Sequence, residues 1–149
     1  MKLFGHPIHL MLTHFPAALF PMELVCYFIF YKTGDTSFSN ASFYAMTGGV
    51  ILGWLSIISG AIDLIRIKDN GAVQAKALIH GSVNTIVVLG YSILTMMIYK
   101  DYPNLPVATL TLLVIKASLN VLMIGGNYLG GNLVLKDKIG VIQSNTKIL

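Results

Sequence analysis

Four apolar runs, each close to the length that a helix needs to cross a lipid bilayer, constrain this chain more than any other feature of its sequence. The hydrocarbon core is about 30 Å thick, and an α-helix crosses it with about 20 apolar residues. Helices and closed barrels are the structures that span lipid, because their backbone polar groups are all bonded internally. A barrel needs short strands of alternating hydrophobicity, which these runs lack. The predicted spans are 8–31, 41–65, 75–99 and 105–126.

The connections between the runs are short, at 32–40, 66–74 and 100–104. Short connections favour antiparallel neighbours in a bundle. The sequence therefore predicts an all-α fold, a four-helix transmembrane bundle with up-down-up-down topology and both termini on the same side. The chain 1–149 is then one transmembrane domain, and its last segment, 127–149, is a Gly-rich interfacial tail.

Charged residues are scarce, and their placement predicts an orientation. They make up 11% of the chain, against about 25% in a soluble domain, which excludes a soluble enzyme or a nucleic-acid binder. Cytoplasmic loops of membrane proteins carry an excess of Lys and Arg. We therefore expect the bacterial inner membrane, with both termini cytoplasmic. Lys2, Arg66, Lys68, Lys76, Lys136, Lys138 and Lys147 fall on the side of the termini, and Lys32 and Lys100 on the other.

Two charged residues, Glu23 and Lys116, lie inside the first and fourth runs. A lone charge near the bilayer centre costs about 2.5–3.5 kcal/mol even on insertion scales. Helical rise places the two residues about 7 Å apart in depth, which a lysine side chain can bridge. The sequence predicts an intramembrane ion pair between them.

The histidines gather on the side of the termini, although the chain visits that side three times. Helical rise places His14 about 9 Å and His80 about 8 Å inside their runs, so the two imidazoles are expected at nearly the same depth. Asp63 continues a seam of small residues in the second run, and Asn84 shares a helix face with His80. These four residues are expected to form one pocket, with Arg66 at its rim.

This pocket suggests a b-type haem held between His14 and His80. Imidazole is a common haem ligand, and helices diagonal to each other in a bundle are about 11–14 Å apart, which leaves room for a macrocycle. Asp63 or Asn84 would accept the other ring N–H, and Arg66 would contact the propionates. The function would then be electron transfer with a partner chain or a quinone in the lipid bilayer.

Other functions stay open at this point. His6 and His9 could join His14 and His80 in a site for zinc, copper or iron, and Asp63 with His80 could relay protons in a small transporter. The chain could also be an accessory subunit of a larger complex, and it could form a homodimer. No acyl-transfer triad or phosphate loop is present, so we expect an electron carrier or accessory subunit rather than a catalyst.

The sequence resembles a bacterial membrane family known as a domain of unknown function, the DUF "twenty-two thirty-one" group. The resemblance covers nearly the whole chain, and its spaced histidines and prolines are its most specific part. The matching stretches are His6-Pro7-Ile8-His9 with His14-Phe15-Pro16, Gly60-Ala61-Ile62-Asp63, His80 with Asn84, and Gly130-Gly131-Asn132-Leu133-Val134 with Gly140-Val141.

The resemblance implies a four-helix membrane protein, and some relatives look fused to Rieske iron–sulfur modules, which implies a redox setting. Two features depart from the family pattern. Leu10 stands where members often have a second proline, and this chain shows no fused module. Any redox partner is therefore expected to be a separate chain.

Overall fold

The computed structural model describes residues 2–3, 6–65 and 71–137, with the backbone alone at residues 2–3 and 6–7. Four helices account for most of this part of the chain, and each is long and apolar enough to cross a membrane. The predicted fold class, a four-helix transmembrane bundle, is confirmed. The helices are α1 (Ile8–Thr33), α2 (Thr36–Ile65), α3 (Gly71–Tyr99) and α4 (Leu110–Leu135), preceded by two short antiparallel strands, β1 (Lys2–Leu3) and β2 (His6–Pro7).

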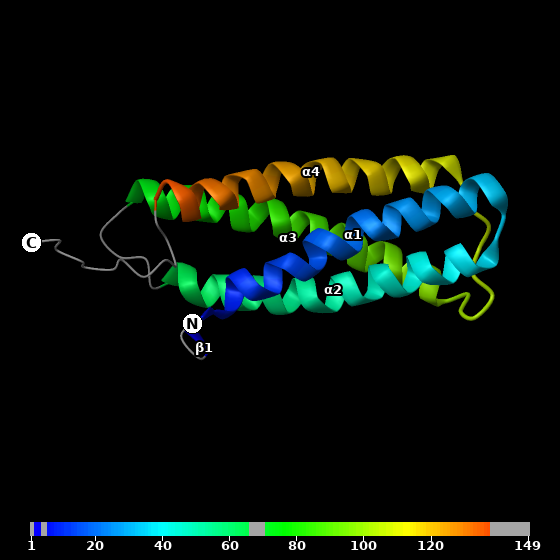
Figure 1. The fold of residues 1–149 in the computed structure, drawn as a ribbon, viewed down its shortest axis with the longest axis horizontal. Helices are drawn as coiled ribbons and strands as arrows, with labels where there is room; N and C mark the ends of the chain where they lie inside the picture. The colour runs from blue at the N-terminus through cyan, green and yellow to red at the C-terminus, as the bar shows by residue number, and fades with distance from the viewer. Residues whose placement is uncertain (1, 4–5, 66–70, 138–149) are drawn as a thin grey trace, which may run out of the picture.

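The helices pack in a ring, with α1 and α3 on one diagonal and α2 and α4 on the other. Helix α1 packs most extensively on α2 and also on α4, while α3 packs on α2 and α4. Helix α1 begins and α4 ends at the same end of the bundle, which we call the histidine end (Figure 1). At the distal end, α1 joins α2 and α3 joins α4.

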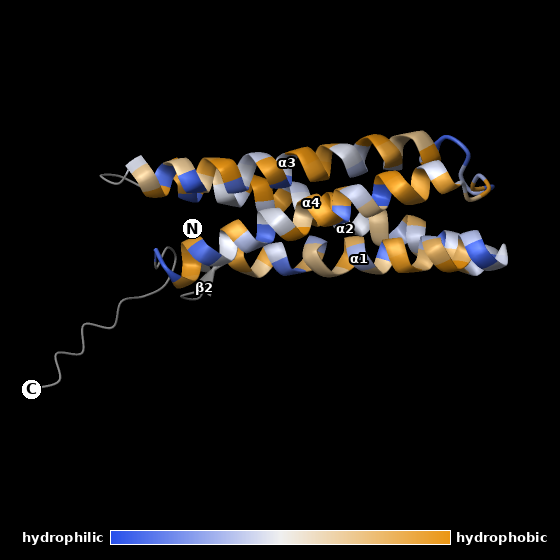
Figure 2. Cartoon of the chain, turned by 90° about the horizontal axis from the view of Figure 1, so that it is seen from above, coloured by the Kyte–Doolittle hydropathy of each residue, from blue (hydrophilic) through white to orange (hydrophobic). Residues whose placement is uncertain are grey.

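Apolar residues cover the outside of the bundle as well as its centre. Figure 2 shows apolar colours along the length of the helices, with hydrophilic residues mostly toward the two ends. Residues such as Ile51, Ile93 and Val121 are large, apolar and exposed, which suits a surface that faces lipid acyl chains. The buried interior is narrow and centres on Phe20 and Tyr91.

Helix α4 begins and ends later than the sequence predicts. Thr109 has an extended backbone and its hydroxyl accepts a hydrogen bond from the Leu112 N–H, so it caps the helix at Leu110. At the other end, α4 continues to Leu135, so residues 127–135 of the expected tail are helical. Small residues are tolerated in membrane helices where another helix packs closely against them, as α3 does here.

Helix α2 presents the predicted seam of small residues to its neighbours. Gly49 lies under the ring of Phe20, Gly53 under Val88 and Gly60 under the ring of His9. A Cβ at Gly49 would lie 2.6 Å from Cε1 of Phe20, which is too close for the ring to stay in place. The seam therefore lets α1 approach α2 closely.

Replacing Gly49 by Ala is expected to destabilise the bundle. The added methyl would displace Phe20, and overpacking of this kind costs about 1–3 kcal/mol. Gly48→Ala is the matched control, because its Cβ would meet only Leu19 Cδ1, at an ordinary 3.5 Å. Thermal unfolding of both variants in detergent should show a lower Tm for Gly49→Ala alone. Equal Tm values would contradict close packing at this seam.

Candidate functional site

Two histidines face each other across the interior at the histidine end. His9 comes from the first turn of α1 and His80 from α3, on the diagonal of the bundle. Their ring centroids are 6.4 Å apart and the ring planes meet at 76°. Both side chains are half-buried. We call these two residues the histidine pair.

A backbone carbonyl fixes the orientation of each ring. Nδ1 of His9 lies 2.9 Å from the carbonyl oxygen of Ser56, and Nδ1 of His80 lies 2.7 Å from that of Gly126. A carbonyl oxygen only accepts hydrogen bonds, so Nδ1 carries the proton in both rings. Within the described residues neither Nε2 makes a hydrogen bond. Nε2 is therefore the ring nitrogen that each histidine could offer to a ligand.

Glycines on the neighbouring helices make room for the two rings. A Cβ at Gly60 of α2 would lie 2.7 Å from Cε1 of His9, and one at Gly130 of α4 would lie 2.5 Å from Cε1 of His80. Any larger residue would push the ring away from its carbonyl. These glycines are therefore part of the site.

Asn84 and Asp63 lie near the histidine pair. The Asn84 amide donates to the His80 carbonyl oxygen at 3.0 Å and lies 3.1 Å from its Nδ1. It packs on Gly126, where a Cβ would lie 2.9 Å from the amide nitrogen. Asp63 is half-buried, close enough to His9 for their charges to interact. Asn84 thus contacts His80 directly, while Asp63 lies near His9.

His14 does not join this site, which corrects the pairing expected from the sequence. It lies on the exposed side of α1, and its Nδ1 bonds to the carbonyl oxygen of Leu10 in its own helix, at 2.6 Å. His14 follows His9 by five residues, a rotation of about 140° around the helix axis. The structure therefore brings His9, not His14, to His80. The side chain of His6 and the whole of Arg66 lie outside the described residues.

A second polar cluster lies deeper in the bundle, where the structure brings Glu23 and Lys116 together. The ammonium group of Lys116 contacts Oε1 of Glu23, and both side chains are fully buried. The same ammonium group lies 3.9 Å from the ring centroid of Tyr27, a cation–π contact. The lysine thus has two partners, one charged and one aromatic.

Hydroxyl and amide groups from the other helices complete this cluster. Ser42 donates to Oε1 of Glu23 at 2.8 Å, and the Tyr91 hydroxyl lies 3.5 Å from Oε2. The Asn120 amide donates to the Tyr91 hydroxyl at 2.7 Å. The sequence does not indicate the contacts of Tyr91 and Asn120, and it gives no signal for Ser42, which is a common residue in an apolar helix.

Among the described residues, no group of three or more His, Cys, Asp or Glu side chains is arranged to hold a metal ion. The histidine pair supplies two imidazole rings from α1 and α3, with centroids 6.4 Å apart.

The comparisons with known proteins agree with the fold. A family model described as "Predicted membrane protein (DUF2231)" matches residues 5–143, which is nearly the whole chain. Neither the curated proteins nor the solved structures give a match.

Proposed function

This chain belongs to the DUF2231 family of predicted membrane proteins, and for it we propose electron transfer through a b-type haem held between His9 and His80. The observation that carries this proposal is the histidine pair, with both rings fixed through Nδ1 and both Nε2 atoms left for a ligand. Haem iron is commonly held by imidazole, and its potential is tuned by the hydrogen bonds of its ligands.

The separation of the two rings leaves room for a metal ion between them. A metal lies about 2.0–2.1 Å from a ligating imidazole nitrogen, and the two ring centroids here are 6.4 Å apart. His9 of α1 and His80 of α3 would hold the iron of a bound haem.

Each neighbouring residue has a defined part in this proposal. The carbonyls of Ser56 and Gly126 hold the two rings in the ligating tautomer, and Gly60 and Gly130 leave room at the ring edges. Asn84 braces His80 against α4. When bound, haem would supply one-electron chemistry at its iron, and the protein would supply position and electrostatics.

We also infer the setting of this site. The excess of basic residues at the histidine end supports a cytoplasmic location for that end and insertion in the bacterial inner membrane. The electron partner would be a quinone in the bilayer or a separate redox chain. A homodimer stays a prediction.

Absorption spectroscopy of the purified protein tests the proposal. We expect a red preparation with a Soret band, which His9→Ala or His80→Ala abolishes because each variant removes one of the two imidazoles that would hold the iron. His14→Ala is the matched control: it removes a histidine from the same helix as His9 and should leave the band unchanged, because His14 lies on the exposed face.

Two outcomes would contradict the proposal. A Soret band lost in His14→Ala but kept in His9→Ala would mean that His14, on the other face of α1, holds the haem in place of His9. A preparation that stays colourless after haem is added would favour a function without redox chemistry. If that preparation binds metal, the site is a zinc, copper or proton site. If it does not, the protein is an accessory subunit.

A further inference from the structure

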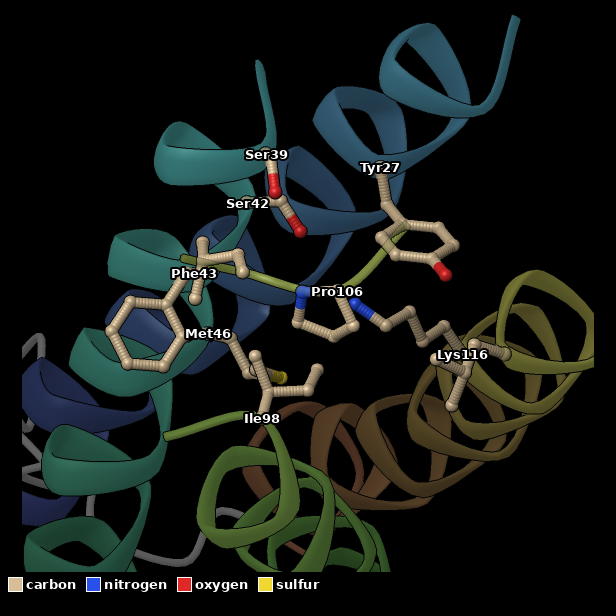
Figure 3. Close-up of a pocket in the computed structure, with 10 residues that line it drawn as sticks. Tyr27, Ser39, Ser42, Phe43, Met46, Ile98, Pro106 and Lys116 are labelled. Carbon is tan, nitrogen blue, oxygen red and sulfur yellow. The ribbon is translucent and has the colours of Figure 1, made fainter. Parts of the chain in front are cut away.

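The hydrogen bonds that join α1 to α4 in the described chain lie between the middle of the bundle and its distal end. The Tyr27 hydroxyl accepts from the Thr109 N–H at 3.0 Å, and Figure 3 shows Tyr27 and Lys116 side by side. At the middle, the Asn120 amide lies 3.4 Å from the Phe20 carbonyl oxygen. Toward the histidine end, α1 leaves α4 and crosses to α2 (Figure 1).

The exposure of side chains shows that α1 and α4 separate beyond the middle of the bundle. Phe20 and Asn120 are both buried where the two helices meet. Seven residues make nearly two helical turns, so Thr13 shares a face of α1 with Phe20, and Asn127 shares a face of α4 with Asn120. Thr13 is half-buried and Asn127 is exposed. Two faces that meet at the middle are therefore apart nearer to the histidine end.

Thr13 and Asn127 flank an opening that leads to the histidine pair, and we call it the lateral opening. Thr13 follows His9 by one turn, and Asn127 precedes by three residues the Gly130 on which the His80 ring packs. Asn127 lies about 12 Å inside the end of α4, within the hydrocarbon region of a bilayer. The lateral opening therefore faces acyl chains, and what enters it comes from the membrane.

Both polar side chains at the lateral opening have unused hydrogen-bonding capacity. The Thr13 hydroxyl donates to the Leu10 carbonyl oxygen at 2.9 Å, which leaves its own oxygen to accept. The Asn127 amide bonds to no residue in the part of the chain that the structure describes. Leaving an amide unpaired in hydrocarbon is unfavourable. The lateral opening therefore suits an apolar molecule that carries polar groups of its own.

We propose that the lateral opening binds the head group of a lipid-soluble quinone, with Asn127 as its main hydrogen-bonding residue. A quinone carbonyl accepts from the Asn127 amide nitrogen, and a quinol hydroxyl donates to the amide oxygen, so one side chain binds both redox forms. A phospholipid ester offers acceptors alone. The quinone tail would lie among the acyl chains, beside exposed apolar residues such as Ile124.

The choice of a quinone rests on the proposed haem function, because it names a membrane carrier rather than a separate redox chain as the electron partner. The lateral opening lies within one turn of residues that form or hold the histidine pair, so a bound quinone ring would be a near neighbour of the iron site. Binding of the quinone itself needs no haem. The two proposals can therefore be tested separately.

Photolabelling of the haem-free full chain tests the quinone site. The probe is a short-tailed quinone that carries an aryl azide, added to the protein in phosphatidylcholine nanodiscs. Mass spectrometry should place the label within 10–17 of α1 and 124–131 of α4. An excess of unlabelled short-tailed quinone should remove most of this label, because the two molecules compete for one site.

Asn127→Leu should lower the labelling about tenfold, because it keeps a similar side-chain size and removes both polar groups. The matched control is Asn104→Leu, at an exposed asparagine of the connection between α3 and α4, and it should label as the wild type does. Leucine at an exposed position that faces lipid should leave the helices intact, which circular dichroism checks.

Label that spreads evenly over the outer helix faces, or that excess quinone does not remove, would overturn the proposal and leave phospholipid as the occupant. Equal labelling of Asn127→Leu and wild type would overturn the part given to Asn127. A Soret band without displaceable label would overturn the quinone site alone. Displaceable label in a protein that never binds haem would support the quinone site and overturn the haem.

Discussion

Glu23→Gln is expected to lower the free energy of unfolding by about 3–5 kcal/mol, because it leaves the buried Lys116 charge without its counterion. The ring of Tyr27 would then be the nearest favourable partner of the ammonium group, and it offsets only part of the loss. The loss should appear as a lower midpoint of denaturant unfolding in mixed detergent, measured by circular dichroism.

A double variant separates the lost charge pair from the lost glutamate. Glu23→Gln combined with Lys116→Met removes both charges and should recover most of the lost stability, since buried ion pairs replaced by uncharged side chains are often tolerated. Lys100→Met, at an exposed lysine, is the control for losing a positive charge and should change the midpoint little. If Glu23→Gln unfolded at the same denaturant concentration as wild type, the contact would contribute nothing to the fold.

Gly130→Val is expected to abolish haem retention, whereas Gly131→Val should retain it. A Cβ at Gly130 would lie 2.5 Å from Cε1 of His80, whereas nothing lies within 4 Å of a Cβ at Gly131. The first variant must displace the ring from the carbonyl of Gly126, so we expect haem affinity to fall by at least about a hundredfold. Both variants place the same β-branched residue in the same turn of α4, so helix propensity cancels.

The measurement is a haem titration of both variants, read from the Soret band relative to protein absorbance. Unfolding in detergent provides a readout that needs no haem, because displacing a packed ring should also cost Gly130→Val about 1–3 kcal/mol. Equal affinity and equal stability in the two variants would mean that His80 does not need its position against α4.

The sequence predicts the spans well, because a bilayer imposes its thickness on every apolar run that crosses it. The meeting of Glu23 and Lys116 is predictable for a related reason. Two charges in adjacent spans at similar depth have few other partners, and the structure places them in contact. Features that the membrane imposes, such as span length and the pairing of buried charges, can therefore be predicted from the sequence.

The depth of a residue in the membrane was not enough to predict which histidine of α1 pairs with His80. His14 and His80 match in depth, yet the structure places His14 on the exposed side of α1. His9 precedes Glu23 by fourteen residues, which returns it to within about 40° of the same face. Rotational position around the helix was therefore the better guide. Carbonyl partners such as Ser56 could not have been predicted, because every residue carries a carbonyl and only the packing selects one.

The glycines of α4 could have been interpreted more closely. Gly126 and Gly130 are four residues apart, so they share a helix face, and both lie against α3. Each belongs to a Gly-Gly doublet, Gly125-Gly126 or Gly130-Gly131, and such a doublet by itself suggests a turn. The spacing of four residues between the doublets, however, is typical of close contacts between membrane helices. Only the packing of Asn84 and His80 over them distinguishes the two interpretations.

The pairing of α1 with α2 and of α3 with α4 has a consequence for biogenesis. These two contacts are the most extensive in the bundle, and each joins helices that are consecutive in the chain. His9 and Glu23 belong to the first half of the protein, and His80 and Lys116 to the second. Neither half carries a complete polar site, so nascent chains still lacking the last two helices would hold half-built sites that only docking of the second half completes.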